Sequence, residues 1–450
     1  MDEVFRYIDA NVPAALDEII EYCRLPTVSA QALSIEETAR YTLALLEREG
    51  FDASILEKPA GGFPVVYGEQ AGRSPKTLLF YNHYDVQPPD PLNEWTSGPF
   101  EPVRRGDKLY GRGVSDDKGN IVSRLLVVRA LKQAFGELPC NVKFCIEGDE
   151  EIGSPQISPF VRQYRDRLQA DACIWEWGHA LWDGSPTLML GVKGLLCLEL
   201  QVKLANHDVH SSYATVVPNP AWRLAWALAS IKAPDERILI DGFYDDVTDP
   251  TEEELATVRI LPDDGPEFLA SLGLETAVLG VRDVAYRRRH IFEPTVTING
   301  LTSGYQSAGP KTVLPARASA KLDFRLVNDQ DPDDIARKLR RHLDKQGFED
   351  VLIVEASKER PARSPMDDPF VALCQAAARE VYGRDAFLVP SMAATGPMYH
   401  FVHDLGLPCV MAGINYVGGC DHAPNEHIRL ADFHLGTKHI AALLQRFGEA

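Results

Sequence analysis

The sequence predicts an α/β protein in which a domain built on a mixed sheet flanked by helices is interrupted by an inserted α+β domain. Short apolar segments alternate with amphipathic helices in both terminal parts of the chain, which is typical of α/β proteins. From about residue 195, apolar and polar residues begin to alternate, as in an antiparallel sheet with one exposed face. At 450 residues the chain is also too long for one ordinary core, so two domains are expected.

Residues 1–194 and 361–450 are predicted to form the mixed-sheet domain. Apolar residues recur at helical spacing in the first 50 residues, and short apolar runs of strand type follow them. In the first part we expect two helices before residue 50, strands at 53–56, 64–67, 77–81, 141–146 and 172–175, and helices at 120–135 and 159–168. In the second part we expect a helix at 369–382, a strand at 408–411 and a closing helix at 432–447.

Residues 195–360 are predicted to form the inserted domain. The segment 195–204 alternates between apolar and polar residues, and further strands are expected at 295–298, 318–324 and 351–354. Helices are expected at 219–231 and 333–346. Half-exposed strands flanked by helices describe an α+β module.

Composition and charge restrict the possible partners. The 46 basic and 65 acidic residues give a net charge of −19, which argues against nucleic acid or an anionic membrane as a partner. We find no apolar run long enough to span a membrane, and the N-terminus lacks the basic and apolar pattern of a secretory signal. The eight cysteines are scattered without a CxxC pair, which favours reduced thiols and predicts a cytoplasmic protein.

Several predicted strands end in histidine or acidic residues. His83 and Asp85 follow the strand at 77–81, Glu150 and Glu151 follow the strand at 141–146, and Glu176 follows the strand at 172–175. Taken alone, each of these segments is equally typical of a polar surface loop. Open α/β sheets, however, place ligands at the carboxyl ends of their strands, so the side chains are expected to meet at one edge.

Two glycine-containing loops add further candidates to this edge. Asp116 lies in GRGVSDDKG, where the acids are also consistent with a simple helix start, and His422 follows the glycine pair Gly418-Gly419. Two histidines and several carboxylates, without cysteine, suit zinc, with manganese or cobalt as substitutes. A histidine that binds metal commonly donates its other ring N–H to a carboxylate, and Asp85 is placed for that role beside His83.

The order of these motifs resembles a known family. HYD, GRGVSDDKG, EGDEEIGS, a lone acid, HSS and GGCDHAPNE are similar to the motifs of the dinuclear zinc peptidases and amidohydrolases. That family includes carnosinase-type cytosolic dipeptidases, carboxypeptidase G, succinyl-diaminopimelate desuccinylase, acetylornithine deacetylase and aminoacylase. The match spans nearly the whole chain, and the dipeptidase branch looks closest because of DDKG, EGDEEIGS and KTVLPARASAKLDFRLV. The resemblance implies a zinc-aminopeptidase-like catalytic domain with an inserted lid and dimerisation domain.

The resemblance also implies roles for individual residues. Each subunit would hold two Zn²⁺ ions, one bound by His83 and Glu176 and the other by Glu151 and His422. Asp116 would bridge both ions. Glu150 would be the general base, and Asp85 would orient His83. The peptide bond between Asp116 and Asp117 is expected to be cis.

Four residues outside this set are further candidates through the resemblance. His210 would stabilise the oxyanion, in many members from the partner subunit of a homodimer, although Ser212 replaces the usual glycine of that motif. Arg325 is similar to the family's arginine for the substrate carboxylate. Thr395 and Gly396 occupy the place of a GGSIP-like loop that contacts the substrate, and the different residues here leave the substrate open.

The resulting prediction is a dinuclear zinc hydrolase that cleaves a peptide bond in dipeptides or short peptides with a free carboxylate. An N-acyl-amino-acid amidohydrolase is the alternative, because the same site serves both reactions. A binding protein that has lost its chemistry is disfavoured, since all the ligands and the base are present. Trp175, Trp177 and Trp182 are consistent either with core positions or with an apolar wall beside the metals.

Overall fold

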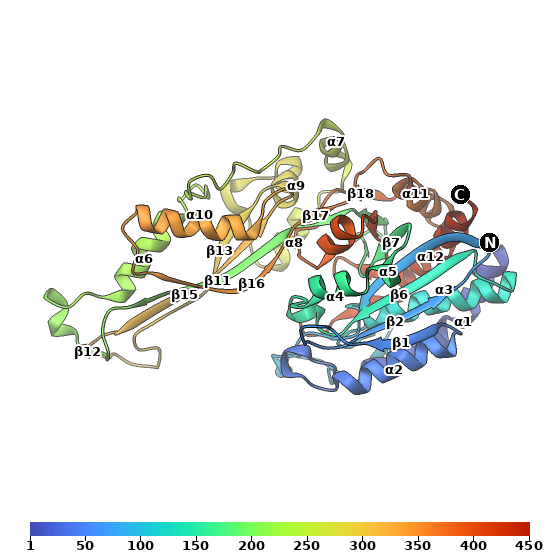
Figure 1. The fold of residues 1–450 in the computed structure, drawn as a ribbon, viewed down its shortest axis with the longest axis horizontal. Coiled ribbons are helices and arrows are strands. Elements are labelled where there is room, and N and C mark those ends of the chain that lie inside the picture. Colours follow the sequence, from blue (N-terminus) through green and yellow to red (C-terminus); the bar gives the residue numbers. More distant parts are fainter.

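A mixed sheet of eight strands forms the body of the protein, which a computed structural model describes from Met1 to Ala450 (Figure 1). In spatial order its strands are β1 (Asp52–Leu56), β2 (Val65–Gln70), β6 (Cys140–Glu147), β3 (Ser74–His83), β7 (Ala172–Trp175), β19 (Cys409–Met411), β9 (Thr187–Met189) and β18 (Phe387–Val389). Strands from both terminal parts of the sequence therefore share one sheet. The predicted α/β fold class is confirmed.

Helices cover both faces of this sheet. One face packs against α1 (Asp2–Cys23), α2 (Ile35–Arg48), α3 (Lys118–Phe135), α11 (Pro369–Tyr382) and α12 (Leu430–Glu449), with which it shares a core of 53 buried residues. The other face packs against α4 (Ile157–Gln163), α5 (Arg165–Leu168) and a π-helical turn at His400–Asp404. Because both faces are buried, the central strands are almost continuously apolar.

The parallel pairing of three central strands determines where the polar loops meet. β3 pairs in parallel with β6 on one side and with β7 on the other, and His83 at the end of β3 lies opposite Glu147 at the end of β6. The segments that follow these strands therefore leave the sheet at the same edge. This edge carries the predicted site.

A second, antiparallel sheet extends away from the body (Figure 1). Its strands are, in order, β13 (Thr295–Ser303), β15 (Arg317–Leu326), β11 (Gly194–Lys203) and β16 (Leu352–Glu359). Helices α6 (Pro220–Ile231) and α10 (Pro332–Lys345) share with it a separate core of 22 buried residues. Burial alternates along β11, as its sequence predicts, since only one face of the sheet meets helices. The chain passes between the two sheets through the paired strands β10 (Gly191–Val192) and β17 (Ala362–Arg363).

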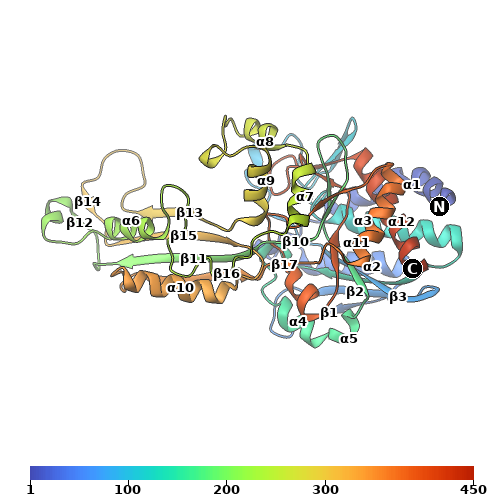
Figure 2. The ribbon, with the colours of Figure 1, turned by 90° about the horizontal axis from the view of Figure 1, so that it is seen from above.

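Three helices lie where the second sheet meets the body: α7 (Glu252–Ile260), α8 (Gly265–Ser271) and α9 (Asp283–Phe292) (Figures 1 and 2). A small cluster formed by Val258, Ile291 and Phe292 packs against Val389 at the edge strand β18 of the body. The sequence analysis assigned no structure to this segment. Because it lies beside the body, this segment forms one wall of the main cavity, which is described below.

The remaining elements are short. β4 (Val103–Arg105), β5 (Lys108–Tyr110) and β21 (His427–Arg429) form a three-stranded sheet, while β8 (His179–Ala180) pairs with β20 (Asn415–Tyr416) and β12 (Val209–His210) with β14 (Val313–Leu314). The helix expected at 159–168 is wrong as one element, because Tyr164 leaves the helical conformation and separates α4 from α5. None of the helices is long and apolar enough to cross a membrane.

Candidate active site

Asp116 lies between two histidines that come from distant parts of the sequence. Its Oδ1 is 2.9 Å from Nε2 of His83, and its Oδ2 is 3.0 Å from Nε2 of His422. The Asp116–Asp117 peptide bond is cis, as the resemblance predicts. Burial would lower the pKa of His83, but the carboxylates of Asp116 and Asp85 raise it well above its usual range. One carboxylate therefore offers an oxygen to each imidazole.

Glu151 brings a second carboxylate to His422. Its Oε2 is 3.1 Å from Nε2 of His422, and ligand atoms of His83, Asp116 and Glu151 all lie within 4.8 Å of one another. Gln87, which the sequence analysis did not single out, holds Glu151 in place. Its backbone N–H donates to Oε1 at 3.1 Å, and its side-chain amide donates to Oε2 at 2.8 Å.

Asp85 fixes the turn that carries the adjacent glutamates. Its buried carboxylate accepts hydrogen bonds from the backbone N–H groups of Glu150 and Glu151, at 3.3 and 3.0 Å. Nδ1 of His83 lies 3.0 Å from the backbone oxygen of Asp85 and 3.4 Å from its carboxylate. When Nδ1–H of His83 donates to Asp85, Nε2 of His83 is free to bind a metal. Asp85 thus positions groups on both sides of the site.

Glu176 completes the set and leaves one oxygen without a partner. Its Oε1 accepts a hydrogen bond of 3.0 Å from the indole of Trp175, whereas its buried Oε2 has no hydrogen-bond partner and lies 3.9 Å from Nε2 of His83. A buried carboxylate oxygen without a partner is costly unless a cation or a proton satisfies it. The nitrogen and oxygen donors and this unpaired oxygen fit a divalent metal.

Glu150 lies among these acids, and its surroundings shift its pKa. Burial, followed by the negative charge of Glu176, raises the pKa of Glu150 well above its usual range. A Cβ added to Gly396 would lie 3.6 Å from the Glu150 carboxylate and 3.5 Å from that of Glu176, so the backbone at Gly396 passes close to both. A carboxylate with a raised pKa at a cavity wall is a candidate general base.

Glu426 supports the loop that carries Asp116, and the sequence analysis gave it no role. Its fully buried Oε1 accepts hydrogen bonds from the backbone N–H groups of Gly113, Ser115 and Asp116, at 3.0, 2.9 and 3.0 Å. Arg112 donates to Oε2 at 2.7 Å and balances the charge. The late motif containing Glu426 was the available signal, but its contacts required the fold.

A family model described as peptidase family M20/M25/M40 matches residues 79–446. The chain belongs to this peptidase family. The M20 assignment confirms the family predicted from the motifs, and with it the metallopeptidase class.

Known M20 proteins resemble this chain over almost its whole length. The human Beta-Ala-His dipeptidase is 26% identical, over 98% of this chain and 92% of the relative. The Cys-Gly metallodipeptidase DUG1 of Saccharomyces cerevisiae is 27% identical, over 100% of this chain and 98% of the relative. The crystal structure of an M20 family metallo-carboxypeptidase, Sso-CP2 from Sulfolobus solfataricus, matches with a TM-score of 0.92 and 37% identity, over 97% of this chain and 99% of that one. The chain is therefore a metal-dependent hydrolase of peptide bonds.

The acidic turn of this M20 peptidase rests on a buried ion cluster. Lys58 forms ion pairs with Glu147 and Asp149, and all three side chains are buried. Asp149 also accepts a hydrogen bond of 3.0 Å from the backbone of Phe63. Asp149 is thus part of the scaffold beneath Glu150 and Glu151.

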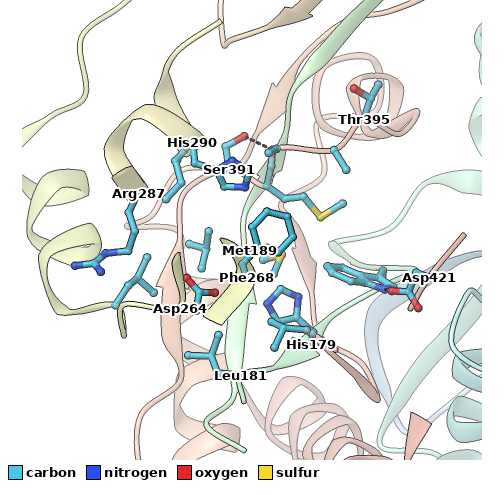
Figure 3. A pocket seen from close by; sticks show the side chains of 18 of the residues that line it. His179, Leu181, Met189, Asp264, Phe268, Arg287, His290, Ser391, Thr395 and Asp421 are labelled. Atoms are coloured by element: carbon cyan, nitrogen blue, oxygen red, sulfur yellow. Dashed lines mark hydrogen bonds between the residues drawn. The ribbon is translucent and has the colours of Figure 1, made fainter. Parts of the chain in front are cut away.

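A cavity of about 530 Å³ opens onto the site (Figure 3). Asp116, Glu150, Glu176 and His422 are among the residues that line it. Trp177 and Trp182 line the wall, whereas Trp175 is buried and stacks on Tyr81 with 3.9 Å between ring centroids. Of the three tryptophans for which core and wall positions were both expected, Trp175 therefore occupies a core position, and Trp177 and Trp182 occupy the cavity wall.

The substrate-binding candidates of the M20 peptidase lie in two places. Arg325 donates a hydrogen bond of 2.8 Å to the hydroxyl of Thr395, which itself lines the cavity. His210 is exposed on β12, at the end of the second sheet that points away from the body (Figure 1). There its ring contacts only local groups, Ser212 and Thr312. Within one chain the structure does not bring His210 to the site.

Proposed function

We propose that this metallopeptidase cleaves dipeptides or short peptides with a free carboxylate, at a centre for two zinc ions, with manganese or cobalt as substitutes. The observation that carries the proposal is the position of Asp116 between His83 and His422, with Glu150 beside them. In the proposed centre, His83 and Glu176 would hold one ion, and Glu151 and His422 would hold the other. Asp116 would be a ligand of both. The unpaired Oε2 of Glu176 and the excess of carboxylates support this ligand set.

Glu150 is proposed to move the proton in the reaction. Two divalent cations bound there would polarise the scissile carbonyl and lower the pKa of a water molecule. Positive charge in the site also favours the ionised form of Glu150, whose pKa burial otherwise raises. Ionised Glu150 accepts a proton from the attacking water and then protonates the leaving amine. Glu151 stays ionised as a ligand, so the two neighbouring glutamates have different roles.

Arg325, Thr395 and Gly396 are proposed to bind the carboxylate end of the substrate. The guanidinium of Arg325 already reaches Thr395 at the cavity wall, and a guanidinium binds a carboxylate with two parallel hydrogen bonds. Gly396 lets the backbone pass close to Glu150 and Glu176. A free carboxylate held here would place the neighbouring peptide bond at the centre.

We also propose a cytoplasmic homodimer in which residues 195–360 form the lid and the dimerisation domain. His210 then stabilises the oxyanion in the site of the partner subunit, which accounts for its distance from its own site. Trp222 and Trp226 support a contact at this domain, because they stack on each other at 6.1 Å on α6 while 61% and 58% exposed. The eight free cysteines support a reducing compartment.

The names of the relatives support a peptide substrate over an N-acyl amino acid, since both full-length relatives above are dipeptidases. The test is to load the protein with zinc, incubate it with matched dipeptides and N-acyl amino acids, and follow the products by mass spectrometry. We expect cleavage of dipeptides, and its loss in Glu150→Gln. Two bound metals without cleavage of any dipeptide would contradict the proposal.

A further inference from the structure

The cavity at the proposed metal centre is larger than the peptide bond and the attacking water molecule require. Its volume of about 530 Å³ falls within the range of small-molecule sites, about 300–1,000 Å³. The proposed catalytic carboxylates make up only part of its lining. The opposite wall comes from α8 and α9, which place Asp264, Arg287 and His290 across the cavity from Asp421 (Figure 3). A substrate can therefore extend from the centre to these helices.

Most of the lining between these two ends is apolar. The side chains come from three separate segments, and they are Leu181, Met189, Leu261, Phe268, Ile291 and Val389. A glycine or alanine side chain would leave most of this surface in contact with water. A large apolar group would displace that water, and apolar surface removed from water favours binding.

The basic groups at the far end offer little positive charge to a substrate. Arg287 lies 3.3 Å from Asp263 and donates a hydrogen bond of 3.1 Å to the carbonyl of Val258, so its guanidinium is engaged. Burial lowers the pKa of His179 to about 3 and also lowers that of His290, so both imidazoles are neutral near pH 7. An acidic side chain entering here would lose its hydration without gaining a free cationic partner.

We infer that this cavity is a specificity pocket for a large, uncharged apolar or aromatic side chain of the substrate, one residue of the cleaved peptide. The inference rests on the proposed function and narrows it. Helices α8 and α9, which belong to the segment between the two sheets, then determine which peptides are cleaved. Phe268 of α8 and Tyr286 of α9 are the aromatic contacts in this wall.

The test compares dipeptides that differ in one side chain, with the zinc-loaded enzyme. The set is Phe-Ala, Ala-Phe, Ala-Ala and the corresponding Asp and Lys dipeptides. We expect at least one phenylalanine dipeptide to exceed Ala-Ala by about tenfold or more in kcat/KM. The Asp dipeptides should not exceed Ala-Ala, because Arg287 is already paired, and the Lys dipeptides should stay below the phenylalanine dipeptides, because most of the lining is apolar. Equal cleavage of charged and aromatic dipeptides would overturn the pocket assignment, whereas no cleavage of any dipeptide would instead overturn the proposed function.

Two substitutions, one within α8 and one at the residue that follows it, supply a matched pair. Phe268 and Leu272 are 51% and 58% exposed, but only Phe268 lines the cavity. We expect Phe268→Asp to abolish most of the preference for the phenylalanine dipeptide over Ala-Ala. Phe268→Leu should retain part of this preference, and Leu272→Asp should leave the preference unchanged. An unchanged preference in Phe268→Asp, or an equal loss in Leu272→Asp, would contradict the inference.

Discussion

The backbone N–H of Asp116 donates a hydrogen bond of 3.0 Å to the carboxylate of Glu426, a residue 310 positions later in the chain. The same oxygen accepts the N–H groups of Gly113 and Ser115, so one buried carboxylate fixes the whole loop that presents Asp116. A ligand that must contact two histidines at once depends on such a support. Glu426 is therefore a positioning residue that acts through Asp116.

Glu426→Gln should weaken metal binding without removing any ligand. An amide has one oxygen instead of two and cannot balance the charge of Arg112, so the loop loses part of its support. We expect metal affinity to fall by about 10–100-fold, as is typical for the partners of metal ligands. Competition with a chelator measures this affinity. Glu36→Gln is the control, because the Glu36 side chain is 83% exposed, and equal affinities in the two variants would contradict the role of Glu426.

Glu150→Gln and Glu151→Gln should separate catalysis from metal binding. Without an ionisable group at position 150 we expect kcat to fall by about 10²–10⁴-fold while both metals stay bound. Glu151→Gln should lower the metal content instead, because Oε2 of Glu151 lies 3.1 Å from the ligand atom of His422. Metal analysis and steady-state kinetics on the same preparations distinguish the two effects. Full activity in Glu150→Gln would refute the assignment of the base.

The strand-end residues could be predicted from the sequence because their position depends on local rules. His83, Glu151 and Glu176 each follow an apolar strand, and parallel strands bring such residues to one edge. Glu426 and Gln87 could not be assigned in this way. Their roles consist of contacts to segments distant in sequence, and neither residue carries a local pattern that indicates a partner.

The helices α7 to α9 escaped the sequence analysis for a different physical reason. Much of their apolar surface faces solvent or the cavity, as with Ile260 and Phe268, which are 67% and 51% exposed. A periodicity argument expects the apolar stripe of a helix to face a core, and here the core is small. Tyr164 similarly separates α4 from α5, and its hydroxyl donates a long-range hydrogen bond to the backbone of Glu57, which no local pattern indicates.

Removal of the metals should make stability fall as the pH rises. Burial raises the pKa of Glu150 well above its usual range, that of Asp117 to about 7 and that of Asp149 to about 8. Between the usual pKa of a carboxyl group and these raised values, the folded protein keeps protons that the unfolded chain has already released. Raising the pH through this range therefore favours unfolding. For His422, burial lowers the pKa but Asp116 and Glu151 raise it to about 11, which acts in the same direction above the ordinary histidine value.

The measurement is the Tm of chelator-treated and zinc-loaded protein between about pH 6.5 and pH 8. Below this window, buried histidines such as His179 and His439, whose pKa values are lowered to about 3 and about 4, make stability rise with pH and oppose the effect. We expect the Tm of the chelated protein to decrease across this window. The zinc-loaded protein should not show the decrease, because cations bind the deprotonated ligands. A chelated protein that is more stable at the upper end of the window would contradict the described charge arrangement.

Mixing two inactive variants should restore activity if His210 acts in the partner subunit. Glu150→Gln removes the base from one chain, and His210→Ala removes the oxyanion contact from the other, so each homodimer is inactive. A mixed dimer contains one site with both defects and one site with none, because each site combines Glu150 of one chain with His210 of the other. Random exchange between equal amounts of the two variants should therefore recover about a quarter of the wild-type activity. Refolding the mixture and measuring dipeptide cleavage checks this, with each variant refolded alone as the control. No recovery in a mixture shown by light scattering to be dimeric would place His210 outside the partner's site.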